Sequence, residues 1–218
     1  MGRRKTTHAW IRGHLNDPYV QQAQRQGYRS RAAFKLLEIA DSDRLFRRGM
    51  QVIDLGAAPG GWSQVAARRV GPEGRVVALD IAEMAPLPGV VFVQGDMELD
   101  ATVETLLRAL GTAMADLVIS DVAPHLSGVA AADQARSVRL AEAAVDLATR
   151  LLKPDGVFLV KMFQGSGFPE YLALLRRRFA RVVTRKPKAS RDRSREIYLL
   201  ARGVVPEDSG VVPDQGLG

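Results

Sequence analysis

Five charged residues stand at the ends of short apolar runs and are the first candidates for chemistry: Asp54, Asp80, Asp96, Asp121 and Lys161. The runs have the length and composition of buried strands. If those strands are parallel, their carboxyl ends meet at one edge of a sheet, where open α/β sheets bind ligands. Carboxylates there can accept hydrogen bonds from a ligand, and a lysine can hold or take a proton. We therefore expect one ligand site at this edge, although each residue alone could equally cap a turn.

The first apolar run leads into a glycine-rich turn, DLGAAPGGWS (54–63). Glycines let a ligand approach the backbone closely, and the helix that follows offers N–H groups. Ala58 replaces the glycine that admits a pyrophosphate in dinucleotide sites, so a dinucleotide is disfavoured. Asp80 lies 19 residues past Gly61, where an acid binds ribose hydroxyls, and Asp96 could accept from an adenine amino group. An adenosine ligand without a pyrophosphate fits this pattern, and S-adenosylmethionine is one.

The longer run DLGAAPGGWSQVA (54–66) closely resembles the S-adenosylmethionine loop of the FtsJ/RrmJ family of RNA ribose 2′-O-methyltransferases. The resemblance extends from about Tyr28 to Arg202 and includes SRAAFKLLEI (30–39), SDVAPHLSG (120–128), LVKMFQGSGF (159–168) and RKPKASRDRSREIYLLA (185–201). It implies a Rossmann-like S-adenosylmethionine-dependent methyltransferase fold and no metal. It also implies cofactor contacts at Gly60, Trp62, Asp80, Asp96 and Asp121.

The family also uses a Lys-Asp-Lys-Glu tetrad in catalysis, and the resemblance places it at Lys35, Asp121, Lys161 and Glu196. Methylation of a ribose hydroxyl needs a base within hydrogen-bond reach of a weakly acidic proton. We assign that base to Lys161, because it ends an apolar strand, with Lys35 and Asp121 positioning it and Glu196 in support. Lys35 would favour a neutral amine, whereas Asp121 and Glu196 would favour a charged one, and the sequence leaves this balance open.

His125 departs from the family pattern, which commonly has Asn after the D-x-A-P element. The segment has the composition of a loop, so a contact with substrate and plain exposure are both open. Asp121 and Pro124 of the same element are intact, so the departure concerns the loop rather than the reaction.

The elements that must position these residues alternate along the chain. Strand-like runs at 51–55, 75–79, 90–93, 117–120 and 156–160 alternate with helix-like stretches at 60–69, 100–110, 131–151 and 167–178, after a first helix at about 29–39. This alternation predicts a doubly wound α/β sheet. Two last strands, 181–184 and 196–201, have no helix between them and predict an antiparallel edge. With the resemblance, we expect a seven-stranded, mostly parallel sheet with one antiparallel edge strand and helices on both faces.

We expect a single methyltransferase domain at 29–202, a basic N-terminal segment at 1–28 and a disordered tail at 203–218. The net charge of +7 is unevenly spread, because residues 1–48 carry 11 Lys and Arg against 4 acids, and residues 176–195 carry 10 against 1. Such blocks favour a polyanion, with nucleic acid first, over a merely solvated basic surface. If Lys35 and Glu196 meet, both blocks line one face and hold phosphates there.

The amino-acid composition excludes several further classes of protein. Apolar residues make up 46% and charged residues 25% of the 218, which excludes a wholly disordered chain and a coiled coil. The absence of cysteine excludes disulfides, thiolate metal sites and cysteine nucleophiles. There is no apolar run of about 18 residues, and no apolar stretch follows the basic N-terminus, so we expect a cytoplasmic protein without a membrane span.

The sequence therefore predicts methyl transfer from S-adenosylmethionine to a ribose 2′-hydroxyl of RNA, which DNA lacks. We expect the target to be a uridine of 23S ribosomal RNA in the large ribosomal subunit, because the compact length adds no large domain, and we expect a monomer. A tRNA 2′-O-methyltransferase and a non-catalytic RNA-binding module of ribosome assembly are the alternatives. An NAD-dependent dehydrogenase and a small-molecule methyltransferase are disfavoured by the glycine loop and by the basic blocks, respectively.

Overall fold

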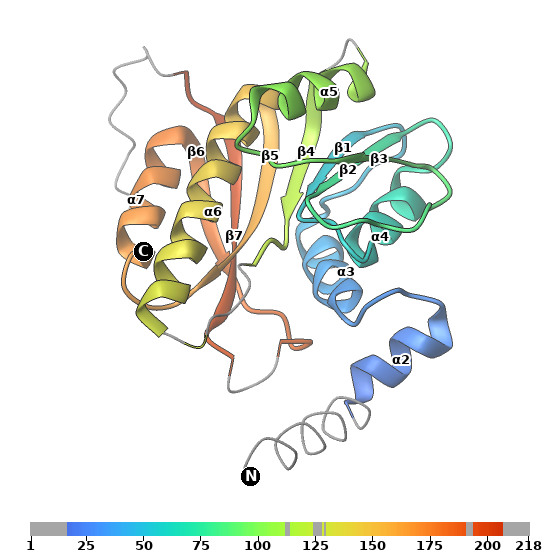
Figure 1. The fold of residues 1–218 in the computed structure, drawn as a ribbon, viewed down its shortest axis with the longest axis horizontal. Helices are drawn as coiled ribbons and strands as arrows, with labels where there is room; N and C mark the ends of the chain where they lie inside the picture. The colour runs from blue at the N-terminus through green and yellow to red at the C-terminus, as the bar shows by residue number, and fades with distance from the viewer. Residues whose placement is uncertain (1–16, 112–113, 124–127, 129, 191–193, 207–218) are drawn as a thin grey trace.

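The strands form one seven-stranded sheet in the order β3-β2-β1-β4-β5-β7-β6 (Figure 1). The structure is a computed structural model and describes residues 17–111, 114–123, 128, 130–190 and 194–206. The strands are β1 Gln51–Leu55, β2 Arg75–Asp80, β3 Val90–Gln94, β4 Ala115–Ser120, β5 Leu152–Phe163, β6 Phe179–Arg185 and β7 Glu196–Val204. Strands β1 to β5 pair in parallel, and β7 runs antiparallel to both β5 and β6. The predicted mixed sheet is confirmed, with the antiparallel pair β6–β7 at one edge and β7 on its inner side.

Helices cover both faces of the sheet, as expected. Their bounds are α2 Pro18–Gln26, α3 Ala32–Asp43, α4 Gly61–Val70, α5 Asp100–Leu110, α6 Ala130–Leu151 and α7 Phe168–Arg178. Apolar side chains of α5, α6 and α7 share one buried cluster with the first face, and those of α3 and α4 share another with the second face. Both clusters are broad, so burial of apolar surface on each side holds the three layers together.

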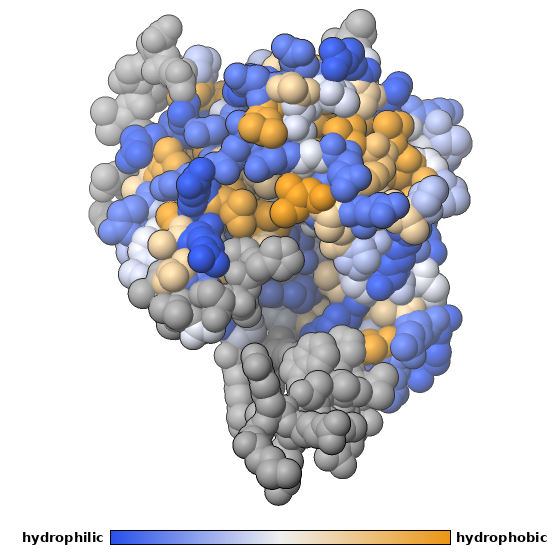
Figure 2. Space-filling model, viewed as in Figure 1, coloured by the Kyte–Doolittle hydropathy of each residue, from blue (hydrophilic) through white to orange (hydrophobic). Residues whose placement is uncertain are grey.

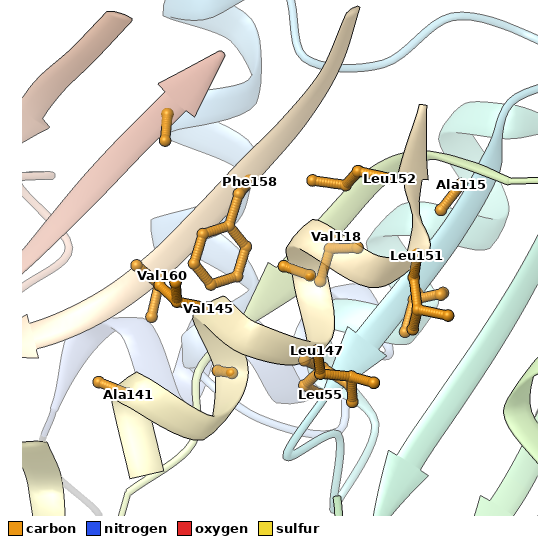
Figure 3. Packing of buried hydrophobic residues seen from close by; sticks show 14 of the residues in the cluster. Leu55, Ala115, Val118, Ala141, Val145, Leu147, Leu151, Leu152, Phe158 and Val160 are labelled. Atoms are coloured by element: carbon orange, nitrogen blue, oxygen red, sulfur yellow. The ribbon is translucent and has the colours of Figure 1, made fainter. Parts of the chain in front are cut away.

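Strand β5 shows how the two faces are assigned. Phe158 and Val160 pack with Val145 of α6 in the first cluster (Figure 3). Leu159 belongs to the second cluster, because successive side chains of a strand point to opposite faces. The same alternation places Lys161 on the face that α3 covers.

Two details differ from the predicted elements. Helix α2 forms within the segment expected only to be basic, because Asp17 accepts from the Tyr19 N–H and Pro18 occupies the first turn. Strand β7 continues to Val204, past the predicted strand end and into the first residues of the expected tail. Residues 1–16 and 207–218, and the loop residues Pro124 and His125, lie outside the described residues. No helix in the described ranges is long and apolar enough to cross a membrane.

Candidate active site

The carboxyl ends of the parallel strands surround a cavity of about 670 Å³, and a hollow with hydrophilic residues opens at this end of the molecule (Figure 2). Three of the predicted acids line it, namely Asp80, Asp96 and Asp121. The other two strand-end residues are not in its lining: Asp54 is fully buried, and Lys161 is 8% exposed and donates to the lining residue Asp121. Sequence spacing therefore located the edge correctly and overestimated how many of its side chains face the cavity.

Asp80 shapes the glycine loop as well as lining the cavity. One carboxylate oxygen accepts from the Ala58 N–H at 2.9 Å, and the other accepts from the Ala82 N–H at 2.8 Å. Each carboxylate oxygen has a second lone pair, so Asp80 can still accept from a hydroxyl group. Asp96 accepts from the Glu98 N–H through one oxygen at 3.0 Å.

Apolar residues that the sequence did not single out complete the cavity wall: Ile81, Met97, Val122 and Leu140. Ile81 is 61% exposed, which is unusual for a large apolar side chain beside a cavity. Apolar side chains flanked by acceptor carboxylates suit the base and sugar of a nucleoside. The signal that could have found Ile81 was its position directly after Asp80.

Gly56 keeps the floor of the cavity open. It has a φ of +72°, and a Cβ there would lie 2.8 Å from Cα of Val122, the residue after Asp121. Only glycine fits this backbone and this approach together. The loop thus brings its main chain to the cavity, as a nucleoside-binding loop requires.

Gly60 and Trp62, the other two predicted cofactor contacts, do not line the cavity. Gly60 is packed against Met84, Leu87 and Arg29, and the Trp62 indole is 2% exposed, with its N–H donating to the Ala32 carbonyl at 2.9 Å. Trp62 is part of the core under α3. A ligand contact at Trp62 would have to use its backbone N–H, which lies in the first turn of α4. Both contacts remain predictions.

The four residues of the predicted tetrad come together next to the cavity. Lys35 Nζ lies 2.6 Å from Glu196 Oε1. Lys161 Nζ lies 3.1 Å from Asp121 Oδ1 and donates to the Asp121 carbonyl at 2.6 Å. The hydroxyl of Tyr198 joins the two pairs, because it lies 3.1 Å from Asp121 Oδ1 and 3.0 Å from Glu196 Oε1. Asp121 belongs to both this cluster and the cavity wall.

Strand register explains why these residues meet. Lys161 pairs with Tyr198 across β5 and β7, and Glu196 lies two residues from Tyr198, so all three point to the same face. Helix α3 covers that face and contributes Lys35. Tyr198 was not singled out from the sequence, and its spacing of two from Glu196 is the signal that could have found it.

Charge and burial set the protonation of this cluster. Burial alone would raise the pKa of Glu196, but the charge and hydrogen bond of Lys35, then the charge of Lys161, hold it below its ordinary value. Burial, with the charges of Asp121 and Glu196, raises the pKa of Tyr198 well above its ordinary value. Glu196 is therefore an anion and Tyr198 a neutral hydroxyl at neutral pH.

Asp54 lies beneath the glycine loop on the α4 side. Its Oδ2 accepts from the Ser63 hydroxyl at 2.6 Å, and its Oδ1 is buried without a partner among the described residues. Burial raises the pKa of Asp54 to about 7 against the effect of Ser63, and the charges of Asp121 and Asp80 add to the rise. A large part of Asp54 is thus protonated near neutral pH, and its contact with Ser63 joins β1 to the first turn of α4.

The C-terminal basic block is divided by the fold. Arg176, Arg177 and Arg178 occupy the last turn of α7, whereas Arg185 at the end of β6 pairs with Tyr198, level with Lys161. The six steps from Phe179 to Arg185 span about 20 Å of strand. The expectation that the whole of 176–195 lines the site is wrong for its first residues, because β6 carries them to the opposite end of the sheet.

A sheet of this order, with a glycine loop after β1, acids at the ends of β2 and β3 and an antiparallel edge, defines a Rossmann-like methyltransferase fold. The chain belongs to the family of FtsJ-like methyltransferases, whose family model matches residues 28–204.

Similar proteins agree with this assignment. The chain is 57% identical over 203 residues to "Ribosomal RNA large subunit methyltransferase E" of Pseudomonas fluorescens, covering 93% of this chain and 97% of the relative. It is 58% identical to the protein of the same name in Alcanivorax borkumensis, with the same coverage. A crystal structure of a candidate ribosomal RNA methyltransferase from Plasmodium falciparum has a TM-score of 0.70 at 28% identity, covering 81% of this chain and 98% of its own. A candidate rRNA methylase from Clostridium thermocellum, at 16% identity and a TM-score of 0.51 over 77% of this chain and 97% of its own, shares the fold.

Proposed function

We propose that this protein methylates the 2′-hydroxyl of a uridine in 23S ribosomal RNA of the large ribosomal subunit, with S-adenosylmethionine as methyl donor. The observation that carries the proposal is the continuous cluster Lys35–Glu196–Tyr198–Asp121–Lys161 at the rim of a nucleoside-sized cavity. The names of the close relatives support ribosomal RNA of the large subunit as the substrate. Such a substrate agrees with a monomer acting in the cytoplasm.

The cavity residues suit the adenosine part of the methyl donor. Asp80 would accept from the ribose hydroxyls and Asp96 from the adenine amino group, with Ile81 against the base. S-adenosylmethionine supplies a methyl group on a positively charged sulfur, and the Asp121 carboxylate at the rim favours that charge. Val122 and Gly56 form the floor and leave no room for a larger loop side chain.

The amine of Lys161 would take the proton of the 2′-hydroxyl during its attack on the methyl group. Asp121 fixes that amine through two contacts, and Glu196 fixes the side chain of Lys35 on the same face. A positioned base supplies much of the rate, because the hydroxyl is nearly all protonated at neutral pH. The Tyr198 hydroxyl has a single proton and lies within hydrogen-bond distance of both carboxylates, so it donates to one of them at a time.

The surface beside the cluster suits RNA. Helix α2 and the segment 187–190 lie against each other through Ala23, Phe34 and Ala189. Ser190 of that segment donates to Glu196 at 3.0 Å, so the surface adjoins the cluster. Arg25 of α2 and Lys188 of that segment are exposed and can neutralise phosphates.

The test is methyl transfer from labelled S-adenosylmethionine to three substrates: purified large ribosomal subunits, naked ribosomal RNA and bulk tRNA. Digestion to nucleosides locates the label. We expect 2′-O-methyluridine in the subunits or their RNA. Label in tRNA alone would keep the chemistry and overturn the target, and cofactor binding with no label anywhere would favour a non-catalytic RNA-binding protein.

A further inference from the structure

The side chain of Arg29, between α2 and α3, is held by backbone carbonyls of two other segments. Nη1 donates to the carbonyls of Pro59 at 3.1 Å and Ala85 at 2.7 Å, and Nη2 donates to that of Pro86 at 2.7 Å. Pro59 belongs to the glycine loop, and the other two follow β2. One guanidinium therefore joins the glycine loop to the segment that follows β2 through charged hydrogen bonds, which are stronger than neutral ones.

Gln64 of α4 adds a second tie to the same place. Its Oε1 accepts from the Arg29 N–H at 2.7 Å, and its Nε2 donates to the Gly27 carbonyl at 2.9 Å. Gly27 is the C-cap of α2, and α4 begins at the end of the glycine loop. The end of α2 is thus bonded to the helix that the loop opens.

Packing leaves Arg29 and the loop little freedom to move separately. A Cβ on Gly60 would lie 3.1 Å from Arg29 Nη1 and 2.7 Å from Leu87. Close-packed contacts of this kind transmit displacement rather than absorb it. A shift of Arg29 would therefore displace the loop whose main chain forms the cavity floor.

The hydrogen bonds of Arg29 and Gln64 link the glycine loop to α2, which is part of the surface that we assign to RNA. Helix α2 is anchored by Val20 and Ala23 and presents a polar side to solvent: Gln21, Gln24, Arg25 and Gln26. Tyr19 and Tyr28 both pack on Phe34 of α3, with ring centroids 5.7 and 5.6 Å apart. RNA that binds α2 would fix the segment that carries Arg29.

We propose that Arg29 is a positioning residue that couples RNA binding on α2 to methyl-donor binding in the cavity. The proposal rests on the function proposed above. Whichever ligand binds first fixes the positions of the 27–29 segment and the loop together, so the second ligand finds its own contacts already in place. The coupling is reciprocal, and the two ligands strengthen each other by the same factor.

The experiment measures the affinity of S-adenosylhomocysteine by equilibrium dialysis, with and without saturating naked ribosomal RNA. For the unchanged protein we expect RNA to raise this affinity by about fivefold or more. Arg29→Lys keeps the charge but cannot span three carbonyls, and Arg29→Gln removes the charge. Both should bind S-adenosylhomocysteine about tenfold more weakly without RNA and lose most of the enhancement by RNA.

Arg69→Gln is the matched control, because Arg69 lies on α4, pairs with exposed Asp41 at 2.6 Å and does not touch the loop. It removes the same charge and should keep both the affinity and the enhancement. Thermal unfolding checks that each variant is folded. If Arg29→Gln does not fold, the Arg29→Lys protein carries the test. An Arg29→Lys protein with the enhancement of the unchanged protein would overturn the coupling. The coupling would also be overturned if RNA left the affinity of the unchanged protein for S-adenosylhomocysteine unaltered. If the unchanged protein did not bind S-adenosylhomocysteine at all, the proposed function itself would be overturned.

Discussion

Lys161 and Lys153 belong to the same strand, and each is paired with one carboxylate. Lys161 Nζ lies 3.1 Å from Asp121 at the carboxyl end of β5, and Lys153 Nζ lies 2.6 Å from Asp116 near its start. Replacing either lysine by alanine removes one amine and its contact with one carboxylate. Their positions differ, because only Lys161 is within reach of the cavity rim. Lys153 is therefore the matched control for the role proposed for Lys161.

We expect Lys161→Ala to lose methyl transfer by about 100-fold or more while cofactor binding survives, because a general base contributes about that factor. Lys153→Ala should keep turnover within about twofold, as a partly exposed ion pair contributes little. Single-turnover rates and S-adenosylhomocysteine titration measure the two effects separately. Near-normal turnover in Lys161→Ala would refute its assignment as the base.

Asp54 predicts a pH-dependent stability. Its pKa is raised from 3.8 to about 7, so its protonated form is favoured in the folded state. The contribution of Asp54 to the free energy of unfolding is greatest below about pH 4, falls as pH rises to about 7 and is constant above that, and the total loss is roughly 4 kcal/mol. Asp121, Asp80 and Ser63 are the groups that act on it.

Asp54→Asn stays neutral at every pH. Its free energy of unfolding relative to the unchanged protein should therefore rise between pH 4 and pH 8. Urea unfolding of both proteins across this range measures the difference, and the trend with pH carries the test rather than the absolute value. Equal pH profiles would show that Asp54 is ionised in the folded protein throughout.

At the scale of elements, the turn after β1 closely approaches the segment that follows β4. Gly56 and Gly49 lie on either side of β1 with φ of +72° and +80°. A Cβ on Gly56 would meet Val122 Cα at 2.8 Å, whereas a Cβ on Gly49 would meet nothing within 4 Å. Replacement by alanine strains both backbones and produces a clash only at Gly56.

Gly56→Ala should therefore lower the free energy of unfolding by about 2–3 kcal/mol, and Gly49→Ala by about 1 kcal/mol. Gly56→Ala should also weaken S-adenosylhomocysteine binding by about tenfold or more, because Val122 follows Asp121 in the cavity wall. Denaturant unfolding and calorimetric titration test the two expectations. Equal losses in both variants would mean that the close approach has no energetic effect.

Local pattern was sufficient to predict most elements and insufficient for the contacts between them. The alternation of apolar strands and amphipathic helices predicted β1 to β7 and α3 to α7 within a few residues. Helix α2 was not predicted, although Asp17-Pro18 is a typical start signal, because its basic surroundings suggested an arm. The place of Trp62 under α3 depends on packing between helices, which no local pattern encodes.

The same limit applies to the site. The acids at the strand ends could be placed at one edge from the sequence alone, since parallel strands end together. Lys35 and Glu196 needed the family resemblance, because one lies on a helix and the other begins an antiparallel strand far along the chain. The hydroxyl of Tyr198 and the wall residue Ile81 depend on side-chain directions that become evident only in three dimensions.

At the scale of the whole molecule, the basic charge falls at both ends of the sheet. Exposed Arg25 lies on α2 and exposed Lys188 lies two residues before Ser190, which donates to Glu196, whereas exposed Arg176 and Arg177 end α7 at the opposite end of the sheet. RNA held with its ribose at Lys161 would contact the first pair, and the second pair lies about one strand length away. Net charge alone would assign equal weight to all four residues.

The salt dependence of RNA binding distinguishes RNA that contacts only Arg25 and Lys188 from RNA that contacts all four residues. Each phosphate contact makes the logarithm of the affinity fall more steeply with the logarithm of the salt concentration. Arg25→Gln with Lys188→Gln should reduce the slope by about 1–2 and weaken binding of naked ribosomal RNA. Arg176→Gln with Arg177→Gln removes the same charge and should leave slope and affinity nearly unchanged. Filter binding at salt concentrations from about 50 to 300 mM measures the slope and the affinity of each double variant. Equal effects of the two double variants would mean that the RNA wraps around the sheet to its far end, so that the substrate-binding surface extends well beyond the tetrad.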